Sequence, residues 1–221
     1  MLKVVVFDSG YGGELFADRL AEELPILDIV RVIDWRHAEE IQSSSRLARK
    51  FAERALRPYI GEVDLIILAN HLLTATSLKY FRRRYQSQKF VGLRLCQPTT
   101  FVDRNTIVLT TRPLAKTINY HNYTFRLHRS LRTLTPDDWL AKIDDGQLSD
   151  GEVCDYIASF VVKENFTPEE VILACAHFSE LKTELHKQLG RNLKIHDSFD
   201  DAIRHTCKAL HLRGGIGKKK K

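Results

Sequence analysis

Short apolar runs alternate with longer amphipathic stretches along the chain, and this alternation limits the fold more than any other feature of the sequence. The runs are rich in Val, Ile and Leu and nearly continuous, as is typical of strands buried on both faces. The stretches between them have the periodicity of helices. This order of elements predicts an α/β fold with mainly parallel sheets.

Eight runs are predicted as strands, at 3–8, 29–34, 64–70, 90–95, 106–111, 124–131, 170–176 and 193–197. Helices are expected at 14–23, 38–60, 75–85, 113–121, 151–164, 179–189 and 199–210. One strand end occurs twice, because residues 65–74 read LIILANHLLT and residues 171–180 read VILACAHFSE. Each run ends in Ile-Leu-Ala and then turns polar. This repetition indicates two similar sheets.

The composition is that of a soluble globular protein, with 221 residues of which 43% are hydrophobic and 28% are charged. No apolar run approaches the roughly 20 residues that a membrane-spanning helix needs. The first ten residues, MLKVVVFDSG, resemble a strand rather than the apolar region of a signal peptide. We therefore expect a cytoplasmic protein with no membrane partner.

The four cysteines are widely spaced and form no Cys-x-x-Cys pair. This spacing argues against a zinc site and, without an export signal, against disulfides. No metal site is predicted. Cys96, Cys154 and Cys207 have no polar residues of suitable type nearby, so we interpret them as small buried hydrophobes.

The net charge of +6 owes four units to the lysines at 218–221, which come after the glycine-rich segment RGGIG. Residues 213–221 are therefore predicted to form a flexible basic tail. Such a tail can contact nucleic acid or an acidic partner, although a merely solvated tail is the simpler interpretation. A second basic stretch, FRRRY at 81–85, is expected at the exposed end of a helix.

Polar residues directly after the predicted strands are the candidates for a ligand site. In open α/β sheets, ligands bind beyond the carboxyl ends of the strands. The residues found there are Asp8, Ser9, Asp34, Asn70, His71, Thr110, Thr111, Cys175 and His177. The alternative for each Asp, Ser, Thr or Asn is a helix cap or a turn, which is the commoner role at such places.

Three motifs of the chain resemble, in order, signatures of glutamate racemases in the aspartate/glutamate racemase superfamily. VVVFDSGYGG resembles the FDSGxGG motif, IILANHLLTATSL resembles the ACNTA region, and VILACAHFSEL resembles the LGCTHYP motif. The resemblance extends from about Lys3 to Leu210. It implies two pseudo-two-fold related α/β domains with a cleft between them, at 1–88 plus 191–212 and at 89–190. It also implies cofactor-independent chemistry on a small amino acid or carboxylate, and it is compatible with a homodimer, since the family often dimerises.

Enzymes of this family invert a Cα centre with two thiols, one on each face of the substrate. The resemblance places the second thiol at Cys175, with His177 beside it, and the first at Asn70. Asparagine has no proton to exchange near neutral pH. We therefore expect ordinary two-base racemisation to be impaired or lost.

From the strand-end positions and the resemblance together, we predict catalytic roles for Cys175, His177 and Asp8. Substrate-binding roles are predicted for Ser9, Asn70, His71, Thr110 and Thr111. Three interpretations of the function stay open. In the first, the protein is a single-cysteine enzyme of altered chemistry, either decarboxylase-like or transferring protons on one side only. In the second, it is a silent ligand-binding or regulatory relative. In the third, it is a racemase that recruits Asn70 and His71 in another way.

Overall fold

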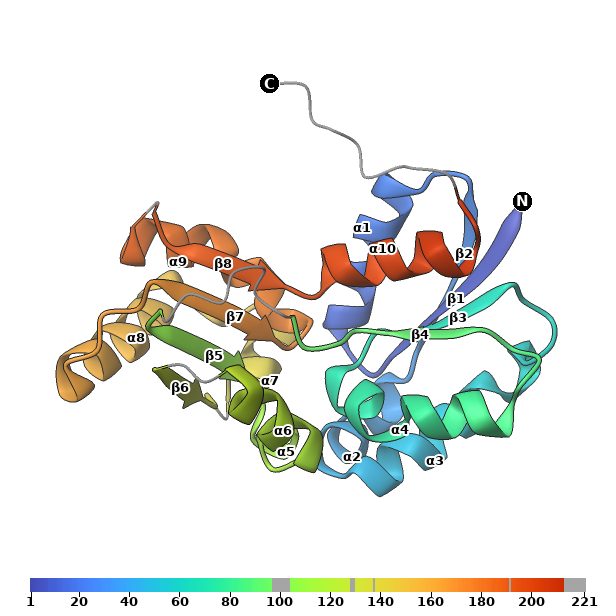
Figure 1. Cartoon of the computed structure of the whole chain (residues 1–221), viewed down its shortest axis with the longest axis horizontal. Coiled ribbons are helices and arrows are strands. Elements are labelled where there is room, and N and C mark those ends of the chain that lie inside the picture. The colour runs from blue at the N-terminus through green and yellow to red at the C-terminus, as the bar shows by residue number, and fades with distance from the viewer. Residues whose placement is uncertain (97–103, 128–129, 137, 191, 213–221) are drawn as a thin grey trace. The chain divides into compact units, whose positions relative to one another are not determined.

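Residues 1–96, 104–127, 130–136, 138–190 and 192–212 are described by the computed structural model. The predicted basic tail at 213–221 lies outside them. The chain divides into two compact units, Met1–Arg94 with Ser198–Lys221, and Leu95–Asp197. Each unit contains a four-stranded sheet with helices packed on it (Figure 1). The predicted fold class, two α/β domains with parallel sheets, is confirmed. No described helix is long and apolar enough to cross a membrane.

The two sheets share one strand order. The first has the order β2-β1-β3-β4 and the second the order β6-β5-β7-β8, and every pair of neighbours is parallel. The strands of the first sheet are β1 (Leu2–Asp8), β2 (Leu27–Ile33), β3 (Leu65–Leu68) and β4 (Phe90–Gly92). Those of the second are β5 (Thr106–Thr110), β6 (Leu131–Leu134), β7 (Glu170–Ala174) and β8 (Lys194–Asp197).

In the first unit, helices cover both faces of the sheet (Figure 1). They are α1 (Tyr11–Glu23), η1 (Trp35–His37), α2 (Ala38–Ser43), α3 (Ser45–Leu56), η2 (Arg57–Tyr59), α4 (His71–Arg84) and α10 (Phe199–Ala209). Val5 and Phe7 of β1 lie in a buried cluster with side chains of α3 and α4. On the other face, Phe16 of α1 packs edge to face on Phe199 of α10, with ring centroids 5.2 Å apart. Because both faces are buried, the strands read as continuous apolar runs.

In the second unit, the helices are α5 (Arg112–Ala115), α6 (Ile118–Leu127), α7 (Trp139–Asp144), α8 (Asp150–Glu164), η3 (His177–Leu181) and α9 (Lys182–Leu189). Ser149 and Glu152 form a capping box at the start of α8. The hydrogen bond from Lys142, supported by those from Ser149, lowers the pKa of the Glu152 carboxyl to about 2. The start of α8 is thus held by an ionised side chain.

The strand predicted at 124–131 is wrong, because α6 continues to Leu127 and β6 begins only at Leu131. The alternation of apolar and polar residues in this stretch does not match burial. Tyr120 and Tyr123 are buried at helical spacing, whereas Phe125 is 74% exposed. The helix predicted at 38–60 is divided, because the Ser44 side chain caps a new helix by accepting a hydrogen bond from the Leu47 amide.

Candidate functional site

The strands β3 and β7 hold the same place in their sheets, beside β1 and β5 respectively. Each strand ends within the sequence Ile-Leu-Ala, β3 at Leu68 and β7 at Ala174, and the residue after that alanine is Asn70 in one unit and Cys175 in the other. The two residues therefore occupy equivalent positions in the two units. The contacts that they make are different.

In the first unit, Asn70 uses both ends of its amide. Its Oδ1 accepts a hydrogen bond of 2.9 Å from the backbone amide of Leu73 and so caps α4. Its Nδ2 donates a hydrogen bond of 2.9 Å to Oδ1 of Asp8, which also accepts from the backbone amide of Ser9 at 2.7 Å. Asp8 is only 1% exposed. The structure thus brings together three residues that the sequence predicted for the site.

The start of α1 packs closely against the Asp8 side chain. A Cβ added at Gly13 would lie 2.4 Å from Cβ of Asp8 and 2.9 Å from Cδ1 of Ile33. Only glycine fits there, which gives the FDSGYGG motif a packing reason. The predicted site residue His71 is the first residue of α4 and is buried, at 6% exposed.

In the second unit, Cys175 lies beside an imidazole rather than at a helix cap. Its Sγ is 3.7 Å from Nδ1 of His177, and Nε2 of His177 is 3.0 Å from Oδ1 of Asp144. Cys175 is 8% exposed and His177 is 3% exposed. These contacts arrange a thiol, an imidazole and a carboxylate in sequence, which is the order found in activated cysteine nucleophiles and bases.

Asp144 is the member of this group that sequence reasoning missed. It ends α7, whose first residue, Trp139, packs edge to face on Tyr156 of α8 and on Phe178 of η3. Since Phe178 directly succeeds His177 in the chain, the same packing brings the end of α7 to the histidine. Asp144 is 33 positions from His177, and no local motif links them.

The helix predicted at 179–189 begins differently in the structure. The chain after Cys175 forms the 3₁₀ helix η3 from His177 to Leu181, which has no side-chain cap, and α9 begins only at Lys182. The Cys175 thiol therefore lies against His177 of the 3₁₀ helix. The short tight turn is what places the histidine ring against the sulfur.

Two predicted substrate-binding hydroxyls are buried at the ends of equivalent strands. Ser9 follows β1 and Thr110 ends β5, and both residues are 0% exposed. Neither hydroxyl has a hydrogen-bond partner among the described residues. Both residues lie at the carboxyl ends of central strands, the edge of an open α/β sheet at which ligands bind. Thr111, by contrast, caps α5 by accepting from the Leu114 amide.

The remaining cysteines are less suited to act as thiolates. Burial, with the hydrogen bond to Glu184 as the second cause, raises the pKa of the Cys154 thiol. Burial also raises the pKa of Cys207. Cys96 is buried and its backbone carbonyl accepts from the Tyr123 hydroxyl. Within the described ranges, no group of three His, Cys, Asp or Glu side chains is placed to hold a metal ion.

Sequence similarity to glutamate racemases extends over nearly the whole chain. The glutamate racemase of Lactococcus lactis subsp. lactis (strain IL1403) is 23% identical over 218 residues, which cover 93% of this chain and 78% of that protein. The glutamate racemase of Limosilactobacillus reuteri (strain DSM 20016) is 26% identical over 217 residues, covering 93% of this chain and 79% of that protein. No protein-family model matches.

Solved structures show the same fold. The Escherichia coli glutamate racemase, in complex with L-glutamate and the activator UDP-MurNAc-ala, has a TM-score of 0.83 at 20% identity, covering 99% of this chain and 86% of that one. Allantoin racemase from Klebsiella pneumoniae has a TM-score of 0.57 at 15% identity, covering 99% and 91% of the two chains. The chain thus has the fold of glutamate racemases and is similar to them in sequence along nearly its whole length.

Proposed function

We propose that this protein belongs to the aspartate/glutamate racemase superfamily and acts on the Cα proton of a small amino acid or carboxylate through one thiol, that of Cys175. Ordinary two-base racemisation is impaired or absent, because Asn70 stands where the first thiol is expected. The similarity to glutamate racemases supports the substrate class. Asn70 contacts a backbone amide and the Asp8 carboxylate, whereas Cys175 contacts an imidazole, and this difference supports Cys175 as the single base.

The proposal rests on the two hydrogen bonds that the Asn70 amide makes. Its oxygen caps α4 and its nitrogen donates to Asp8. Neither group can remove or return a proton near neutral pH. The first unit therefore offers a hydrogen-bonded amide at the position where the second unit offers a thiol.

The contacts of Cys175 suit a base. The Asp144 carboxylate, 3.0 Å from Nε2 of His177, favours the tautomer that carries its proton on Nε2. The lone pair of Nδ1 then faces the thiol at 3.7 Å, and transfer of the thiol proton to Nδ1 leaves a thiolate beside an imidazolium. The thiolate takes the Cα proton as the C–H bond breaks, and the electron pair remains on the substrate next to its carboxylate. Asp144 acts as a positioning residue.

Return of a proton from the same sulfur restores the starting configuration. A single thiol therefore predicts exchange of the Cα hydrogen with solvent, without inversion. Ser9 and Thr110 are assigned to substrate binding, because each lies at the carboxyl end of a central strand of its own sheet, where ligands bind in open α/β sheets.

A decarboxylase-like reaction is the second candidate. It also needs one proton donor, because loss of CO₂ leaves a carbanion that a thiol can protonate on one side. The Cys175–His177 pair satisfies that need as well as it satisfies one-sided exchange.

The test is hydrogen exchange at Cα. The protein is incubated in D₂O with L- and D-glutamate and with L- and D-aspartate, and loss of the Cα proton is monitored by NMR alongside chiral analysis. We expect one enantiomer to exchange without inversion, and Cys175→Ser to abolish the exchange. Cys154→Ser, which changes a thiol outside the site, is the control and should exchange normally.

Inversion of configuration would overturn the single-base proposal and direct the search to His71 as second base. If none of the four amino acids exchanges, the proposed proton transfer at these substrates is wrong. Release of CO₂ from aminomalonate or methylated malonates would then decide between the decarboxylase-like and silent interpretations.

A further inference from the structure

The positive charge of the chain is concentrated on two neighbouring helices of the first unit. Helices α3 and α4 carry eight Lys or Arg residues and one Glu, a net charge of +7, against +6 for the whole chain. The rest of the chain is therefore slightly acidic, even with its lysine tail. The two helices pack side by side on one face of the first sheet (Figure 1).

Three of these basic residues form a row along α3 that Arg57, the first residue of η2, continues. Arg46, Lys50, Arg54 and Arg57 succeed one another at intervals of four, four and three, and all four are exposed. Residues at these intervals lie on one face of a helix. At 1.5 Å per residue the row is about 16 Å long. The opposite face of α3 is buried in the core of the unit, so the row is fixed outward.

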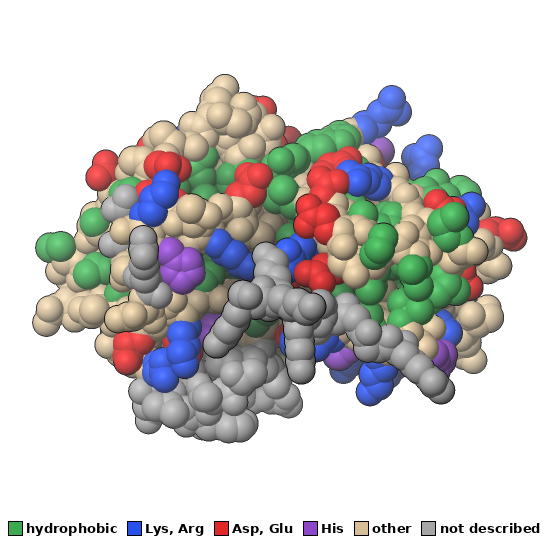
Figure 2. Space-filling view, turned by 90° about the horizontal axis from the view of Figure 1, so that it is seen from above, with side chains coloured by type: hydrophobic (Ala, Val, Ile, Leu, Met, Phe, Trp, Pro, Cys, Tyr) green, Lys and Arg blue, Asp and Glu red, His purple; other side chains and the backbone are tan. Residues whose placement is uncertain are grey.

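We call the exposed side of α3, η2 and α4, with its basic side chains, the α3–α4 surface. Its cations are not paired with neighbouring carboxylates. Among the described residues, no ion pair joins Arg46, Arg49 or Lys50 to an acidic side chain, whereas Arg31 pairs with Glu14 and Asp18. The face displayed in Figure 2 has Lys and Arg side chains interspersed with Asp and Glu. The α3–α4 surface lacks that mixing.

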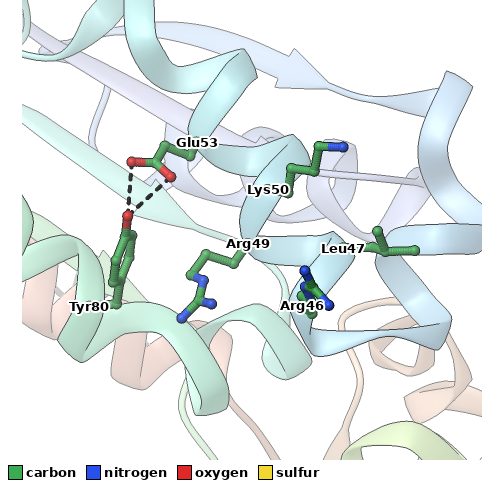
Figure 3. Close-up of a pocket in the computed structure, with 6 residues that line it drawn as sticks. All are labelled: Arg46, Leu47, Arg49, Lys50, Glu53 and Tyr80. Atoms are coloured by element: carbon green, nitrogen blue, oxygen red, sulfur yellow. Dashed lines mark hydrogen bonds between the residues drawn. The ribbon is translucent and has the colours of Figure 1, made fainter.

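A hollow of about 590 Å³ lies between α3 and α4 beside this row, lined by Arg46, Leu47, Arg49, Lys50, Glu53 and Tyr80 (Figure 3). Its one carboxylate is already engaged. Both oxygens of Glu53 accept from the Tyr80 hydroxyl at 3.1 Å, and Oε1 also accepts from the Tyr85 hydroxyl at 2.6 Å. The Arg49 guanidinium lies over the Tyr80 ring, 4.8 Å from its centroid. The hollow is therefore open to an anion.

We propose that the α3–α4 surface binds the phosphate backbone of a nucleic acid, with the row from Arg46 to Arg57 along the strand. Each nucleotide of a strand carries one negative phosphate, so a row of cations about 16 Å long faces several phosphates in succession. An anionic membrane fits less well, because membrane-surface helices also expose large apolar side chains. None of the exposed large apolar residues described lies on α3 or α4.

The test measures binding of a fluorescein-labelled 20-nucleotide DNA strand and of its duplex by fluorescence anisotropy, between 50 and 200 mM KCl. The variant Arg46→Gln/Lys50→Gln/Arg54→Gln removes three charges of the row. Its affinity at 50 mM salt should fall about tenfold or more, and the slope of log affinity against log salt should become shallower by about 2 to 3.

The matched control, Lys116→Gln/Lys163→Gln/Lys194→Gln, removes the same charge from exposed positions of the second unit. Its affinity should stay within about twofold of that of the unchanged protein. Thermal unfolding of both triple variants should match the unchanged protein, since all six side chains are exposed.

A third variant, with Lys218, Lys219, Lys220 and Lys221 changed to Gln, separates the surface from the tail. Retained binding by this variant supports the α3–α4 surface, and loss of binding only in this variant overturns it. Equal losses in the two triple variants would reduce the effect to net charge and also overturn it. Binding of the unchanged protein to phosphatidylserine vesicles is measured last. Binding to these vesicles but to neither DNA form would contradict the proposal.

Discussion

The carboxyl ends of β3 and β7 are equivalent in topology, but the two strands lead into different kinds of helix. After β3 the chain enters α4 at once, and Asn70 serves the backbone by capping that helix. After β7 the chain enters the 3₁₀ helix η3, where no side chain caps the turn and the Cys175 sulfur faces an imidazole. The same position of two similar sheets thus holds a helix cap in one unit and a thiol beside an imidazole in the other.

The largest expected effect comes from removing the thiol. Cys175→Ser should lower the rate of Cα hydrogen exchange at least about 100-fold, because a hydroxyl is a far weaker acid than a thiol and cannot serve as the base. NMR in D₂O measures this rate. Exchange that continues at the original rate would mean that the two strand ends do not differ in chemistry as proposed.

Replacing the carboxylate behind His177 should have the next largest effect. Asp144→Asn keeps the size of the side chain but replaces the carboxylate that lies 3.0 Å from Nε2 of His177 with an amide, and exchange should slow about 10- to 100-fold. Alkylation of Cys175 by iodoacetamide at pH 7, detected by mass spectrometry of its peptide, should slow as well. Unchanged alkylation with slower exchange would instead point to a change of packing.

The packing around Asp8 provides a stability test in the first unit. Gly13→Ala places a Cβ 2.4 Å from Cβ of Asp8, so the start of α1 must move, at a cost of about 2 to 3 kcal/mol. Urea unfolding measures this loss. The control is Gly151→Ala in α8, where an added Cβ meets only Ser149 Oγ at 4.0 Å and stability should be unchanged or slightly higher.

A smaller loss is expected from Asn70→Ala, which removes the α4 cap and leaves Asp8 without one of its donors. We expect a decrease of about 1 to 2 kcal/mol in the free energy of unfolding, measured in urea. Cys175→Ala, the equivalent change in the second unit, removes no cap and should cost less. Equal losses at the two positions would contradict the difference between a helix cap and a thiol beside an imidazole.

The fold could be predicted because parallel strands buried on both faces appear in the sequence as continuous apolar runs. Residues 4–7 of β1 are fully buried and read as one apolar run. The prediction failed at 124–131, where a helix that exposes Phe125 mimics the alternation of a strand. Periodicity reports on burial, so it misleads where apolar side chains face solvent.

The candidate site could be predicted in part. Cys175 and His177 are two residues apart, so their proximity is a consequence of local sequence. Asp144 reaches His177 only because Trp139 packs on two other elements, and such tertiary packing leaves no local signal. The double role of Asn70 also depends on the position of Asp8 in a neighbouring strand.

The two hydrogen bonds of Asn70 also bear on how this protein can change. A cysteine at position 70 would offer a poor cap to α4 and no amide donor to Asp8, so Asn70→Cys loses stability before any new activity is gained. A mutational path toward two thiols must therefore begin elsewhere, with a change that first stabilises the first unit. One side chain thus couples the stability of the first unit to the chemistry available at its strand end, so that a gain of the second thiol carries a cost in folding free energy.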